Sequence, residues 1–213
     1  MPARSGDLLS FWFGISRSDP AAVPERMQRW FGADPAFDAE LRERFGELYA
    51  AARRQALSDW EQTPRGTLAL ILLLDQVPRN IFRGTPSAFA EDAAAQRLCL
   101  DGIAQGYDGA LTPLERGFFY MPLQHAEHLN LQELSVSCFR RLLKESGEEW
   151  RPYLQGMLDY ALEHRDVIAR FGRFPHRNAI LGRASTEEEE RFLAAGAASY
   201  GQTLSKPAGE RQA

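Results

Sequence analysis

Two short segments of this chain mix arginine, asparagine and proline with apolar residues. The first, residues 75–84, reads DQVPRNIFRG, and the second, residues 170–183, reads RFGRFPHRNAILGR. Each contains a proline, then Arg-Asn, then two apolar residues, with glycine and arginine following within a few positions. A guanidinium group is a planar fork of donors that fits a carboxylate or a phosphate. The chemistry that these segments favour is therefore anion binding.

Positive charge is concentrated around these two segments. The chain has a formal net charge of −4, yet residues 164–183 carry +4 and residues 65–83 carry +2. Of the 25 basic residues, 23 are arginines; codon bias can explain that ratio but not where the arginines lie. Glu127 alone cannot neutralise the excess positive charge of these two regions. This distribution of charge favours a pocket that binds an anion.

A purely structural interpretation stays open. Both segments are predicted to be loops, because proline blocks helix propagation and asparagine and glycine tolerate left-handed backbone. Their apolar residues draw them inward, so their polar groups need partners. Asp75, Asp166 and Glu127 can pair with the arginines, while Asn80 and Asn178 cap neighbouring helix ends.

A third polar segment, residues 115–128, adds His125, Glu127 and His128. An imidazole beside a carboxylate can move protons near neutral pH, which makes His125 and His176 candidate acid–base groups. His125 and His128 are three positions apart and would share a helix face. Two histidines alone do not make a metal site, so we expect no metal.

Together the three segments define one candidate site. Its candidate catalytic residues are His125, Glu127 and His176. Its candidate ligand-binding residues are Asp75, Arg79, Asn80, Arg83, Tyr120, His164, Arg170, Arg173, Arg177 and Asn178. We expect no cofactor.

Three functions remain open. The local charge excess favours a helical binding module for an anionic small molecule or an acidic peptide terminus. The first alternative is a hydrolase or transferase that acts on an anionic substrate through histidine acid–base chemistry, and it requires the three segments to converge in space. The second alternative is a protein-interaction scaffold. Whether the protein is an enzyme, and its oligomeric state, stay open.

The elements that position these residues are predicted to be helices. Aspartate or threonine precedes a proline at positions 35, 64, 86 and 113, which is typical of a helix start. Apolar residues recur at spacings of three and four, and period-two alternation is absent. We therefore predict an all-α fold of about eight to nine helices, near residues 6–13, 23–31, 35–56, 64–76, 86–105, 113–121, 123–146, 150–171 and 186–199.

One domain accounts for most of the chain. No linker rich in proline, glycine or serine divides it, so we predict a single helical domain over residues 1–200 and a disordered tail over residues 201–213. Residues 67–76 are apolar nearly all round and predict a buried helix. The aromatic residues at positions 11–13 and 30–31 are expected in the core.

Composition excludes several classes of protein. The longest apolar run has seven residues, against the roughly 20 needed to span a bilayer, so we expect no membrane partner. The net charge argues against a nucleic-acid binder. Two cysteines make neither a disulfide framework nor a zinc cluster, and no nucleotide-binding or hydrolase motif is present. We expect a cytoplasmic protein.

The segments also occur in a recognisable order. They are WFG at 12–14, LLLDQ at 72–76, PRNIFRG at 78–84, YMPLQHAE at 120–127, HRD at 164–166, RFGRFPHRN at 170–178 and LGR at 181–183. Over residues 8–194 the chain resembles the domain of unknown function 924 family of bacterial proteins.

The resemblance implies a fold related to tetratricopeptide-like arrays, with right-handed stacking of antiparallel helix pairs. It implies no established activity, substrate or cofactor. The family commonly has His-Ser-Glu where this chain has alanine at position 126, so a serine nucleophile is excluded here.

Overall fold

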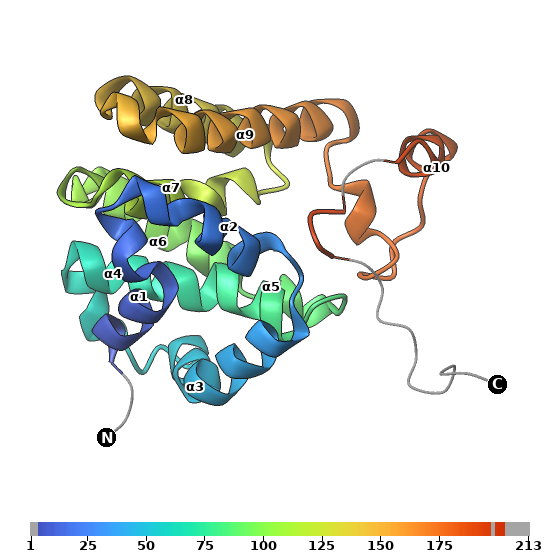
Figure 1. The fold of residues 1–213 in the computed structure, drawn as a ribbon. Coiled ribbons are helices and arrows are strands. Elements are labelled where there is room, and N and C mark those ends of the chain that lie inside the picture. Colours follow the sequence, from blue (N-terminus) through green and yellow to red (C-terminus); the bar gives the residue numbers. More distant parts are fainter. Residues whose placement is uncertain (1–3, 197–198, 203–213) are drawn as a thin grey trace.

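The computed structural model describes residues 4–196 and 199–202, and within these ranges it contains helices and no strand. Two long antiparallel helices, α8 (Leu129–Glu145) and α9 (Arg151–Phe171), form one layer, and α7 (Pro113–Gln124) packs against α8 (Figure 1). The prediction of an all-α, single-domain fold is confirmed. The tetratricopeptide-like right-handed stacking stays a prediction.

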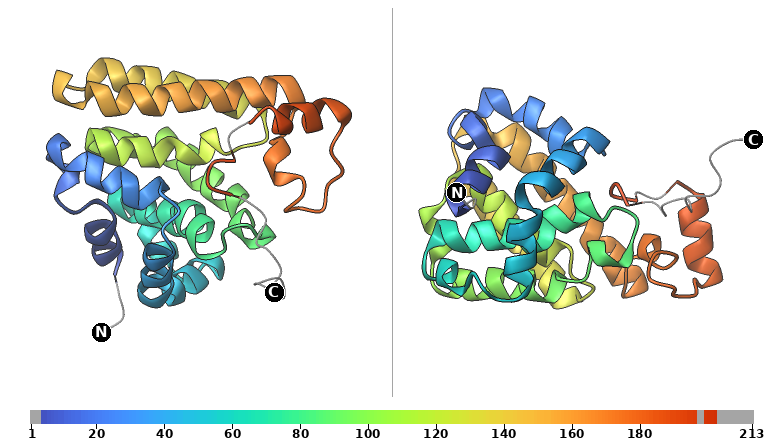
Figure 2. Two further views of the ribbon diagram at one scale, coloured as in Figure 1. Left: turned by 45° about the vertical axis from the view of Figure 1, so that its right-hand side comes forward. Right: turned by 90° about the horizontal axis from the view of Figure 1, so that it is seen from below.

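The other helices complete the body below this layer. Two of the predicted caps form side-chain hydrogen bonds, because Asp34 and Thr63 each accept one from a backbone N–H of the helix that follows, and Thr186 does the same before α10 (Glu187–Ala194). The helix α10 lies beyond the C-terminal end of α9 (Figures 1 and 2). The remaining bounds are α1 (Ser5–Phe13), α2 (Val23–Phe31), α3 (Pro35–Arg53), α4 (Pro64–Ile71), α5 (Val77–Ile81), α6 (Asp92–Ala104) and α10 (Glu187–Ala194).

An aromatic cluster joins α1, α2 and α7. The buried ring of Phe118 lies 5.8 Å from the ring of Trp12, 5.4 Å from that of Phe13 and 4.7 Å from that of Trp30, centroid to centroid. Such edge-to-face contacts stabilise a core beyond the area they bury. The cluster therefore fixes α2 against α7, beside the candidate site.

The first arginine segment is helical, so the prediction of a loop there is wrong. Residues Leu72–Gln76 form a π-helix that leads directly into α5. Pro78 has no N–H to donate and its ring would clash with the carbonyl four residues back, which an ordinary α-helical turn cannot accommodate. A single wide π-turn relieves that conflict, and π-turns recur at functional sites. The helix changes pitch here and does not end.

The second arginine segment and the helix boundaries agree in part with the predictions. The helix α9 extends through Phe171 and ends at Gly172, whose φ of +69° suits glycine. From there the chain forms a loop, as predicted. The loop contains a short 3-10 helix, Pro175–Arg177. The predicted break at 121–123 is displaced, because α7 continues through Pro122 and α8 begins at Leu129.

The first two residues of the predicted tail are held in place. Gln202 Nε2 donates to the carbonyl of Arg79 at 2.8 Å, and Gln202 Oε1 accepts from Gly84 N at 3.1 Å. The rest of the predicted tail, residues 203–213, lies outside the described residues, as do residues 197–198 of the last predicted helix. Among the described helices, none is long and apolar enough to cross a membrane.

Candidate functional site

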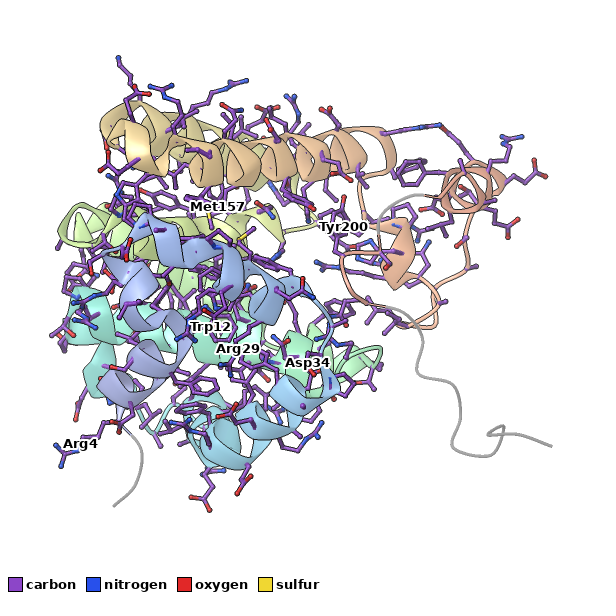
Figure 3. All side chains as sticks on the ribbon, viewed as in Figure 1. Arg4, Trp12, Arg29, Asp34, Met157 and Tyr200 are labelled. Carbon is purple, nitrogen blue, oxygen red and sulfur yellow. The ribbon has the colours of Figure 1, made fainter. Side chains whose placement is uncertain are left out.

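A cavity of about 590 Å³ lies between α2, α5, α7 and α9 and is bordered by the Pro175–Arg177 turn and residues 200–202. Figure 3 labels two of its lining residues, Met157 of α9 and Tyr200, which follows α10 in the chain. The lining includes seven predicted site residues, drawn from three separate parts of the sequence: Arg79, Asn80, Arg83, His125, His164, His176 and Arg177.

Asp75 lies behind the cavity wall and orients His125. Asp75 is fully buried, and its Oδ1 lies 2.7 Å from Nδ1 of His125. The π-helix places Gln76 beside it, with Nε2 2.6 Å from Asp75 Oδ2. Burial opposes the charge of Asp75, but Arg79 and His125 outweigh it and hold the pKa of Asp75 well below its ordinary value. The ionised Asp75 thus accepts a hydrogen bond from Nδ1–H of His125, and Nε2 of the neutral ring carries no proton.

One carboxylate joins the two arginine segments. Asp92, at the start of α6, lies 2.9 Å from Nη2 of Arg79 and 3.1 Å from Nη1 of Arg177. Arg177 also donates to the backbone carbonyl of His125 at 3.1 Å. Burial lowers the pKa of Arg177 to about 10; Asp92 opposes this change and Arg79 adds to it. Arg177 is cationic at neutral pH, and it shares the carboxylate of Asp92 with Arg79.

Three of the four histidines of the chain face the cavity as neutral imidazoles. His164 Nδ1 donates to the carbonyl of Tyr160 at 2.7 Å, and burial, with His125 adding to it, lowers the pKa of His164 well below its ordinary value. Burial and then Arg177 lower the pKa of His176 to about 3. Burial and then Arg79 lower the pKa of His125. These rings therefore offer nitrogen lone pairs at neutral pH without adding charge.

The cavity lining contains arginine side chains and one buried, unpaired amide among its described residues. The described residues that line it include three arginines but no aspartate or glutamate. The side chain of Gln124 is buried and lines the cavity, yet its amide forms no hydrogen bond with any described residue. Because this unpaired amide lines the cavity, it is available to a bound molecule.

The predicted residues Glu127 and Asn178 lie outside the cavity and hold the second loop instead. Glu127 accepts two hydrogen bonds from Arg183, at 2.6 and 2.9 Å, and a third from the backbone N–H of Phe174 at 2.8 Å. Asn178 Oδ1 accepts from Arg183 Nε at 3.0 Å. Glu127 is therefore committed to the loop, and the carboxylate that contacts His125 is Asp75 instead.

Three further predicted residues have partners elsewhere. Arg170 and Arg173 pair with consecutive glutamates of α10, at 2.9 and 2.7 Å, because α10 folds back beside the end of α9. The hydroxyl of Tyr120 donates to Asp108 at 2.5 Å within the core, and Tyr120 does not line the cavity. The structure therefore does not bring these three residues to the site.

Sequence reasoning named Asp75, which pairs with Arg79, but missed Asp38, Asp92 and the apolar part of the wall. Arg83 forms a two-point ion pair with Asp38, which is 45 positions away in the chain. Phe31 was expected in the core but is 49% exposed and lines the cavity. Within the described residues, no group of three or more histidine, cysteine, aspartate or glutamate side chains could hold a metal ion.

Comparison with known proteins gives one family and one solved structure. The family described as Bacterial protein of unknown function (DUF924) matches residues 8–197. The solved structure of the protein of unknown function ATU0120 from Agrobacterium tumefaciens is 38% identical in sequence and has a TM-score of 0.76. The match covers 90% of this chain and 97% of that one. No curated protein matches this chain.

Proposed function

This chain belongs to the DUF924 family of bacterial proteins of unknown function, and from the geometry of its cavity we propose that it binds a small molecule bearing an anionic group. One observation carries the proposal: the described lining holds three arginines and three neutral histidines and no carboxylate. The volume of about 590 Å³ falls within the roughly 300–1,000 Å³ typical of small-molecule sites.

The positions of the charges explain why an anion is favoured although each arginine of the wall has a carboxylate partner. Arg79 and Arg177 line the cavity, whereas their partners Asp75 and Asp92 do not, so a molecule in the cavity lies nearer the arginines than the carboxylates. A bound anion would further balance the charge of Arg177. Charge-assisted hydrogen bonds of this kind are among the strongest in proteins.

Calorimetric titration of the unmodified protein with octanoate and with octanamide tests the proposal. The two probes have the same length and differ in the charge of the head group. We expect octanoate to bind about tenfold or more tightly than octanamide, since only the carboxylate gains charge-assisted bonds. Equal affinities for the two probes would contradict the proposal.

Acid–base catalysis on the bound anion is a second candidate function, favoured by the 2.7 Å contact between Asp75 and His125. His125 has a lowered pKa, so it stays a free base below neutral pH. With an anionic 4-nitrophenyl ester, kcat/KM should fall on acidification with a midpoint below the ordinary histidine pKa of about 6.5. His125→Gln should lower kcat/KM about a hundredfold or more. The exposed His128, replaced by glutamine, is the matched control; no difference between the two variants would exclude this function.

A further inference from the structure

The cavity has two chemically different ends, and we propose that its ligand is an elongated amphipathic anion, such as a medium-chain carboxylate, whose apolar body lies along α9. This inference rests on the proposed function and specifies its ligand class. The anionic head would lie among Arg79, Arg177 and Gln124, and the apolar tail would reach Gly156.

The helix α9 sets the length of the cavity. Gly156 and His164 both line it and are eight residues apart on this helix, a distance of about 12 Å at 1.5 Å per residue. His164 belongs to the polar end, since its ring lies 6.1 Å from the ring of His125 and 4.0 Å from that of Tyr200. A ligand that spans both ends must therefore be elongated.

Apolar side chains lie at the end near Gly156. Met157, the next residue of α9, lines the cavity, and a Cβ atom at Gly117 of α7 would lie 2.5 Å from its Sδ. The ring of Phe118, which follows Gly117, stacks on the ring of Phe31 of α2 at 6.3 Å between centroids. Phe31 is 49% exposed and also lines the cavity, so a ligand that covers it would release water.

Gly156 leaves space at this end. A Cβ atom added at Gly156 would meet no other atom within 4 Å, although the residue lies in the interior of α9. Glycine weakens a helix interior relative to most other residues, so packing does not explain its presence there. By contrast, a Cβ at Gly117 of α7 would lie 2.5 Å from Sδ of Met157, where glycine allows α7 and α9 to approach. The open space beside Gly156 is the place where an apolar tail fits.

Titration with butyrate and octanoate, for the unmodified protein and for Gly156→Leu, tests the ligand class. Each buried methylene strengthens binding by about fourfold, so octanoate should bind the unmodified protein about tenfold or more tightly than butyrate, after ordering costs. Leucine at position 156 should fill the apolar end, so octanoate loses that advantage while butyrate binds as before. Gly46→Leu is the matched control, because Gly46 lies in α3, has the same open surroundings and does not line the cavity.

Each outcome separates this inference from the proposed function. If octanoate and butyrate bind the unmodified protein equally, but more tightly than their amides, the ligand class is wrong and anion binding stands. If neither carboxylate binds, both proposals are wrong. If Gly156→Leu binds octanoate like the unmodified protein, the tail does not lie along α9. The comparison of butyrate with octanoate on the unmodified protein tests the ligand class even if the Gly156→Leu variant does not fold.

Discussion

Replacement of Asp75 by alanine is expected to lower the free energy of unfolding by about 3–5 kcal/mol, the usual effect of breaking a buried ion pair. Asp75 is 0% exposed and contacts Arg79 at 3.1 Å and His125 at 2.7 Å. Without it, Arg79 and Arg177 must share the single carboxylate of Asp92. Urea denaturation followed by circular dichroism measures the loss.

An exposed ion pair gives the matched control for this prediction. Asp101 lies 3.0 Å from Arg97 on the surface of α6, and its side chain is 53% exposed. Asp101→Ala should change the free energy of unfolding by less than about 1 kcal/mol. The double variant Asp75→Leu, Arg79→Met should recover part of the loss, because it removes both charges. A loss below about 1 kcal/mol for Asp75→Ala would show that the buried network does not hold the site together.

Replacement of Arg177 by glutamine is expected to weaken octanoate binding by about thirtyfold, as truncation of a buried charged partner usually does. Arg177 is 6% exposed, and its guanidinium carbon lies 4.6 Å from the ring centroids of both Phe89 and Phe174. These contacts hold the guanidinium in a fixed orientation. A glutamine there keeps a donor but loses the charge and the planar fork.

Arg170→Gln is the control for this prediction. Arg170 belongs to the same sequence segment but pairs on the surface with Glu188 and does not line the cavity. Its replacement should leave octanoate affinity within about twofold of the unmodified protein. Because Arg177→Gln also disturbs the pair with Asp92, thermal denaturation should accompany both titrations. If a folded Arg177→Gln protein binds octanoate normally, the anion does not lie at this end of the cavity.

Local sequence rules predicted the helices well because their causes are local. An N-terminal cap such as Asp34 before Pro35, or Thr63 before Pro64, depends only on neighbouring residues. The same rules failed at Pro78, which they read as a helix breaker. There the tertiary structure keeps residues 68–78 buried and accommodates the proline through a π-turn.

The candidate site was predictable as a set of residues but not as an arrangement of charges. The three candidate histidines and both arginines of the first segment do line one cavity, as their sequence context indicated. Asp75 was named from its place beside Arg79, but Asp92 could not be found by counting nearby charges, because it is 85 positions from Arg177 in the chain. The packing of the helices brings such distant partners together, and the sequence around each arginine does not reveal that packing.

A crystal structure of the protein with 8-bromooctanoate tests the central claim most directly, because the bromine marks the tail by anomalous scattering and the carboxylate marks the head. We predict the bromine beside Gly156 and the carboxylate within hydrogen-bond distance of Arg177 or Gln124. Two results would contradict the account. In one, the cavity holds no probe; in the other, the probe binds only in another arginine-lined groove, such as the one formed by Arg26, Arg29 and Arg44.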